Sequence, residues 1–197
     1  MNTTISELVA RITELEAQLE RALADEMDAK RRQFLYAIDQ GKIAFQQEAR
    51  ELHKTFRQSI PAFLREAPIK TILVSPVIYS VFLPLVLLDA WFWFYQTICF
   101  PAFGIAKVDR SRYILLDRSK LPYLNAIERF NCDYCSYANG LIGYAREIAA
   151  RTEQYFCPIK HAHRRAGAHS RYRDFFDYGD ARAYRTELIK LRDELKP

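Results

Sequence analysis

The stretch that decides the fold is TILVSPVIYSVFLPLVLLDAWFWFYQTICFPAFGIA, residues 71–106. It contains a single formal charge, Asp89, which separates an uncharged run at 71–88 from another at 90–106. A helix needs about 20 apolar residues to cross a hydrocarbon core of about 30 Å. The sequence therefore predicts a membrane segment over residues 69–106. The competing interpretation is a buried core helix.

Three paths through a bilayer fit this segment: a helical hairpin, a re-entrant element and a single tilted span. Pro84 and Asp89 are the positions where a hairpin would bend, because proline removes a backbone donor and clashes with the preceding turn. The run LVLLDAWFWFYQ, however, has no Gly, Asn or Pro with which to turn sharply, and this favours the single span. The aromatic cluster WFWFY after Asp89 is typical of a membrane–water interface, which would place Asp89 at headgroup depth.

The flanks of the segment predict its topology. Basic residues stand on both sides, and cytoplasmic loops carry such an excess: Arg57, Arg65 and Lys70 precede the segment, and Lys107, Arg110, Arg112, Arg118 and Lys120 follow it. The first twenty residues lack the basic and apolar regions of a signal peptide. We therefore expect a hairpin or re-entrant element with both termini in the cytoplasm.

Residues 1–66 have the pattern of cytoplasmic amphipathic or coiled-coil-like helices. Apolar residues recur at alternating steps of three and four, the a/d seam of a heptad repeat: Ile5, Leu8, Ile12, Leu15, Leu19 and Ala22. The seam predicts a homodimer or a partner helix through residues 5–22, and the alternative is a helix that lies on its own chain. A second helix is expected from about residue 30 to 64, with a mild interruption at Gly41.

Residues 107–197 predict a cytoplasmic helical region, so that the whole chain belongs to the mainly α class. A short strand is expected at 113–116, a helix over 124–155 and an amphipathic helix over 181–195.

This region holds the only residues with specific chemistry: Cys132, Cys135, Cys157, His161 and His163. Thiolate and imidazole ligands suit zinc in a tetrahedral site, and an iron–sulfur cluster or haem is the alternative. If 141–155 forms one straight helix, it separates Cys135 from Cys157 by more than one coordination sphere. A shared site needs the chain to fold back, with Asn139, Gly140 and Gly143 as candidate hinges. Packing thiols and a redox dithiol are the remaining interpretations of the CxxC pair.

The stretch KHAHRRAGAHSRYR, residues 160–173, is strongly basic, and the chain carries a formal net charge of +5. Close to a membrane it would attract anionic lipid headgroups. No nucleic-acid-binding module accompanies these charges, so nucleic acid is not expected as a partner.

Motifs of phosphate binding, serine hydrolysis and zinc peptidases are absent from the sequence. The composition therefore favours a membrane-anchored scaffold or interaction protein over an enzyme. A membrane-bound metalloprotein or electron carrier that uses the Cys/His residues is the alternative.

The run LLDRSKLPYLNAIERFNCDYCSYANGLIGYAREIAARTEQYFCPIKHA, with the apolar stretch before it, resembles a family of uncharacterised bacterial inner-membrane proteins. The resemblance covers roughly residues 70–165. It implies a bacterial inner membrane and no catalytic residue, because the family has no assigned activity.

Overall fold

The computed structural model describes residues 3–39 and 42–197, with side chains at 7–38 and 43–197. The chain is mainly helical, which confirms the expected fold class. It divides into two compact units, residues 1–59 with 120–125 and residues 60–119 with 126–197. The apolar segment and the C-terminal region, expected as separate parts, thus pack into the same unit.

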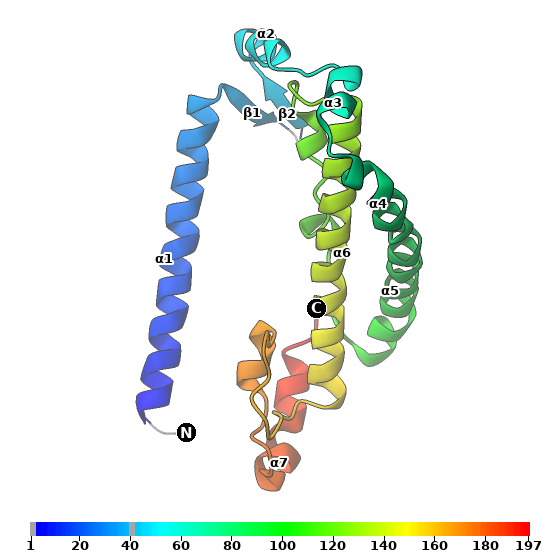
Figure 1. The fold of residues 1–197 in the computed structure, drawn as a ribbon. Helices are drawn as coiled ribbons and strands as arrows, with labels where there is room; N and C mark the ends of the chain where they lie inside the picture. Colours follow the sequence, from blue (N-terminus) through cyan, green and yellow to red (C-terminus); the bar gives the residue numbers. More distant parts are fainter. Residues whose placement is uncertain (1–2, 40–41) are drawn as a thin grey trace. The chain divides into compact units, whose positions relative to one another are not determined.

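The first unit consists of a long helix, a two-stranded hairpin and a short helix (Figure 1). Helix α1 runs from Thr3 to Gln33, strand β1 (Tyr36–Asp39) pairs antiparallel with β2 (Lys42–Phe45), and α2 spans Gln47–Thr55. The helix expected over 30–64 is therefore wrong, and the interruption expected at Gly41 lies outside the described residues. Tyr36, Ile38, Ile43 and Phe45 alternate with other residues, and this period of two with β-branched and aromatic side chains suits strands.

The second unit begins with α3 (Ile60–Glu66), α4 (Ile69–Ser80) and α5 (Phe82–Phe103). Helices α4 and α5 meet at Val81, whose backbone is itself right-handed helical, so they follow one gently curved path (Figure 1). The expected hairpin is wrong in this respect, because the chain does not reverse at Pro84 or Asp89. Pro84 is the third residue of α5, and proline is tolerated in the first turn of a helix.

Helix α5 ends at Gly104, which adopts a positive φ of 66°. The amide of Ile105 donates to the carbonyl of Phe100 at 2.8 Å, and both side chains are buried, as in a Schellman motif. The chain then turns back and runs along α5 toward its start, through the 3₁₀ turns η1 (Arg110–Arg112) and η2 (Arg118–Lys120). We call residues 104–119 the return segment. The strand expected at 113–116 does not form there, because this stretch packs on a helix and not beside another strand.

Helix α6 (Ala126–Phe156) is unbroken and runs in the same direction as α5 (Figure 1). After it come the 3₁₀ turn η3 (Ser170–Asp174) and α7 (Ala181–Asp193). Helix α6 confirms the helix expected at 124–155, and α7 confirms the helix expected at 181–195. The main core lies between α5, the return segment and α6, around Phe100, Leu141, Tyr144 and Ile148. A smaller cluster of Phe175, Phe176 and Leu191 joins η3 to α7.

Candidate functional site

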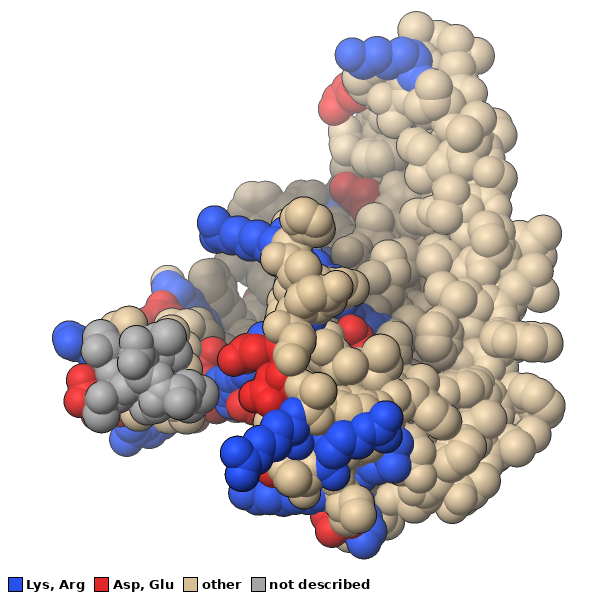
Figure 2. Space-filling model, turned by 90° about the horizontal axis from the view of Figure 1, so that it is seen from below, with Lys and Arg blue, Asp and Glu red and all other residues tan. Residues whose placement is uncertain are grey.

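The outer side of α4 and α5 is a continuous apolar surface. Nine large side chains are each more than half exposed: Ile69, Leu73, Val77, Leu83, Leu87, Trp91, Trp93, Phe94 and Ile98. We call these residues the apolar face. Lys70 stands at the start of this face, and no charged residue interrupts the rest of it, because Asp89, the one charge between 71 and 106, points inward. Figure 2 shows the same side of the molecule, on the right of the view, as a broad area without Lys, Arg, Asp or Glu.

The inner side of α5, together with the last turn of α4, packs on α6. The hydroxyl of Tyr79 donates to Asn131, the hydroxyls of Tyr95 and Thr152 lie 3.0 Å apart, and the ring of Phe103 contacts Tyr155 at a centroid distance of 5.2 Å. The contacts advance together along both chains, from 79 to 103 and from 131 to 155. At about 1.5 Å per residue the two helices therefore lie side by side for about 36 Å.

Asp89 is the centre of a polar group in the middle of this contact. Arg110 of the return segment donates to its carboxylate from Nη2 at 2.6 Å and from Nε at 3.1 Å, and Tyr137 of α6 donates its hydroxyl at 2.9 Å. The hydrogen bond to Asp89 raises the pKa of Arg110. Burial, and next the Asp89 carboxylate, raise the pKa of Tyr137 to about 12. All three groups thus keep their ordinary charge states at neutral pH, and the ion pair joins α5 to the return segment.

Gln96 forms a second polar connection, and it is fully buried. Its side-chain oxygen accepts from the amide of Val108 at 3.0 Å, and its side-chain nitrogen donates to the hydroxyl of Tyr144 and, at 3.4 Å, to the carbonyl of Val108. A buried amide needs such partners, since unmet hydrogen-bonding groups cost about 1–3 kcal/mol. Gln96, a residue of α5, therefore holds both the return segment and α6 to α5.

The contact of α6 with η3 carries further charged contacts of the unit. Glu147 accepts from Arg151 at 2.9 Å and from Arg171 of η3 at 2.8 Å, and Arg171 also donates to the buried Gln154. Burial raises the pKa of Glu147, but the hydrogen bonds from Arg151 and Arg171 together outweigh it, so the pKa is lowered. Helix α6 is thus a central layer, with α4 and α5 on one side and η3 and α7 on the other.

The structure does not bring the expected metal ligands together. Cys132 is half-buried and Cys135 is exposed on α6, and Cys157 follows the end of α6. Cys157 lies 22 residues after Cys135, which at a rise of about 1.5 Å per residue amounts to about 33 Å along the helix. The fold-back at Asn139, Gly140 and Gly143 is absent, because α6 passes through these residues unbroken. Among the described residues there is no group of three or more Cys, His, Asp or Glu side chains that could hold a metal.

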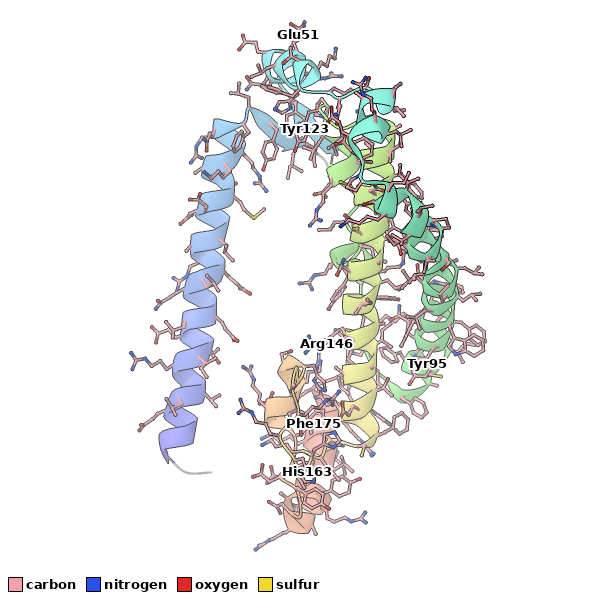
Figure 3. The ribbon with its side chains drawn as sticks, viewed as in Figure 1. Glu51, Tyr95, Tyr123, Arg146, His163 and Phe175 are labelled. Atoms are coloured by element: carbon pink, nitrogen blue, oxygen red, sulfur yellow. The ribbon has the colours of Figure 1, made fainter. Side chains whose placement is uncertain are left out.

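His161 and His163 are exposed and line an open surface hollow with Arg164, Arg165 and Tyr178. This basic loop lies on the side of α6 away from α5: in Figure 3, His163, Phe175 and Arg146 lie on one side of α6 and Tyr95 on the other. Arg146 secures the loop by donating to the carbonyls of Gly167 and Ala168 at 2.9 and 2.7 Å. Binding of anionic headgroups by this loop stays a prediction, and it would have to occur on the side opposite the apolar face.

Asp89, Arg110, Gln96 and Glu147 organise the unit, although the pattern of the sequence did not single out their partners. Asp89 was the most visible of them, as a lone charge in an apolar run that must find a partner. Gln96 carried the same signal, as a polar amide inside WFWFYQTICF. The sequence did not indicate that residues 104–119 return along α5, and this path brings Arg110 and Val108 beside that helix.

No protein-family model matches the chain, and no curated protein or solved structure matches it either. The resemblance to bacterial inner-membrane proteins therefore stays a prediction.

Proposed function

We propose that the protein is a membrane-anchored scaffold or interaction protein of the bacterial inner membrane, with both termini in the cytoplasm. The apolar face of α4 and α5 is the observation that carries this proposal. The stretch Ile69–Phe103 is also long and apolar enough to cross a membrane by length and composition.

The energy of the apolar face supports the proposal. Fully burying a large apolar side chain is worth about 1.5–3 kcal/mol, so covering nine that are more than half exposed is worth on the order of 10 kcal/mol. Soluble monomers rarely expose a contiguous apolar patch of this kind. A lipid phase would cover the face without demanding a matching shape, and the exposed Trp91 and Trp93 suit its interfacial zone.

The scaffold part of the proposal rests on α1. Its apolar row is exposed along its length: Leu8, Ile12, Leu15, Leu19, Leu23 and Met27 are each more than half exposed. A helix with such a row, attached to an anchored unit, is suited to hold a partner at the membrane surface.

Vesicle flotation tests the anchor. Protein purified in detergent is mixed with phosphatidylcholine vesicles, the detergent is removed, and the vesicles are floated on a density gradient. We expect the wild type to float and the Leu73→Glu, Leu87→Glu variant to float at least tenfold less, because two carboxylates then face the lipid. Ile189→Glu is the matched control: Ile189 is 73% exposed on α7, so the same charge there should leave flotation unchanged. Equal flotation of all three proteins would contradict the proposal.

A further inference from the structure

The return segment bears directly on how α4 and α5 can meet a bilayer. It is irregular backbone that runs beside α5, and it carries six charged side chains: Lys107, Asp109, Arg110, Arg112, Asp117 and Arg118. Irregular backbone does not occur at hydrocarbon depth where it is exposed to lipid, because its N–H and C=O groups lack partners there. If α5 crossed the bilayer, this segment would have to cross with it.

The position of the ion pair of Asp89 and Arg110 argues against a helix that crosses the bilayer. Asp89 is fourteen residues from the end of α5 and twenty from the start of α4, about 21 and 30 Å along the helices. The pair is thus near the middle of the apolar stretch, and the Arg110 side chain is 43% exposed there. In a crossing arrangement this open guanidinium would stand in the central part of the bilayer, whereas it is an ordinary surface group if water reaches that side.

Helix α6 adds a second reason. It accompanies α4 and α5 for about 36 Å, longer than the hydrocarbon core of about 30 Å. It carries seven charged residues: Glu128, Arg129, Asp133, Arg146, Glu147, Arg151 and Glu153. Each charge at the centre of a membrane costs about 2.5–3.5 kcal/mol, so about four unpaired charges at that depth would already offset the gain of order 10 kcal/mol from covering the apolar face. Together α6 and the return segment carry thirteen charged residues.

The distribution of charge in the unit fits a different orientation. The apolar face is on one side of α6, and the basic loop with η3 is on the other (Figure 3). Exposed cations flank the apolar stretch, Arg65 and Lys70 before it and Lys107 after it, where they can reach phosphate groups at the surface. The polarity of the unit therefore changes in the direction perpendicular to the helix axes, from the apolar face to the basic loop, and not from one end of the helices to the other.

We infer that α4 and α5 lie parallel to the membrane surface, with the apolar face among the acyl chains of one leaflet and α6 and the return segment toward water. This inference rests on the proposed membrane attachment and gives it a form other than a span or a hairpin. The apolar face is then covered by the lipids of a single leaflet. No part of the second unit then reaches the opposite leaflet.

A depth profile tests the orientation. In a background with Cys99, Cys132, Cys135 and Cys157 changed to serine, Leu73→Cys, Leu87→Cys and Ile98→Cys each receive a spin label, and the depth is measured in phosphatidylcholine vesicles from the relative accessibility to oxygen and to a water-soluble nickel chelate. We expect three similar depths, about 5–10 Å below the headgroups. A crossing helix would place Leu87 deepest and the other two nearer to the opposite surfaces, because about 21 and 16 Å separate Leu87 from them along the helix.

A variant that keeps only the native Cys135 is the control on α6. Cys135 is exposed on α6, and its neighbour Tyr134 packs against Phe82 of α5 with ring centroids 6.3 Å apart. We expect it to react with a membrane-impermeant maleimide added to intact vesicles.

The outcomes separate the two proposals. Equal depths with a reactive Cys135 support the inference. A deep Leu87 with shallow ends and an unreactive Cys135 would overturn it and leave the membrane anchor standing. Labels that all remain in water would overturn the anchor as well, and a dimer that the Leu73→Glu, Leu87→Glu variant loses in sedimentation would then assign the apolar face to a second copy.

Discussion

Gly140 is the residue at which the return segment comes closest to α6. A Cβ at this position would lie 2.5 Å from the carbonyl oxygen of Tyr113 and 2.9 Å from the Cα of Ile114, both backbone atoms. At Gly143 the nearest atom is Cδ1 of the Tyr113 ring, 3.3 Å away. Only glycine therefore fits at 140, whereas a methyl group at 143 needs only a small movement of one side chain.

We predict that Gly140→Ala destabilises the protein and that Gly143→Ala does not. Alanine gains about 1 kcal/mol over glycine inside a helix, but overpacking against backbone at 140 costs about 1–3 kcal/mol. The expected result is a lower free energy of unfolding for Gly140→Ala and an equal or higher one for Gly143→Ala. Denaturant unfolding in the same detergent measures both. A Gly140→Ala protein as stable as the wild type would show that the return segment does not lie there.

The sequence alone suggested hinges at these glycines, since glycine commonly breaks helices. The reason for glycine at 140 is a neighbour 27 residues earlier in the chain, Tyr113. Local patterns cannot reveal such a partner. Asp89 was likewise expected at headgroup depth from the aromatic residues beside it, and its pairing with Arg110, 21 residues later, was not predicted.

At the scale of elements, α1 has an apolar row that its own unit does not cover. Leu8, Ile12, Leu15 and Leu19 are each more than half exposed, and the row continues through Leu23 and Met27. Ile5 belongs to the same pattern, but its side chain lies outside the described residues. A row of this length is close to the minimum for a coiled-coil seam, so it supports at most a modest affinity.

We predict that the protein is a homodimer through this row. Leu15→Asp with Leu19→Asp should convert the dimer to a monomer, because a charge at a seam position loses its packing and remains unpaired. Leu52→Asp is the control: Leu52 is 58% exposed on α2, away from the row. Sedimentation velocity in detergent at tens of micromolar distinguishes the states. A monomeric wild type would contradict the prediction and leave a heterologous partner helix as the alternative.

The elements were predictable to different degrees. The periodicity of 3.6 identified α6 and α7, because their apolar residues recur over many turns. It failed at the strands Tyr36–Asp39 and Lys42–Phe45, because four alternating residues in each are too few to stand out from the helical pattern around them. The proposed hairpin at Pro84 failed because proline is tolerated in the first turn of a helix.

At the scale of the whole molecule, a metal centre would need ligands from both ends of α6. Because about 33 Å of continuous helix separates Cys135 from Cys157, we predict that protein purified without chelators contains no stoichiometric zinc or iron. The Cys132→Ser, Cys135→Ser variant should then match the wild type in metal content and in thermal stability. Elemental analysis of both proteins makes the comparison. About one metal per chain, lost in the variant, would mean that α6 breaks and would restore the metalloprotein hypothesis.

The arrangement of the second unit could not be predicted from the apolar segment alone. Length and hydropathy measure whether a helix could cross a bilayer, but they do not show what lies along its inner side. Here the inner side is occupied by α6 and by a charged return segment, and both are consequences of the tight turn at Gly104. The orientation relative to the membrane is thus a property of tertiary packing.

The shared direction of α5 and α6 also has an electrostatic consequence. Each helix carries about half a negative charge at its C-terminal end, and in parallel neighbours these partial charges repel at the same end of the unit. Neither helix has a basic residue in its last turn. The compensation comes from elsewhere: Arg192 of α7 donates to the carbonyl of Tyr155 at 2.8 Å, and Arg151 donates to the carbonyl of Ala106 just beyond α5. The cationic C-terminal region therefore neutralises the combined field of two aligned helices.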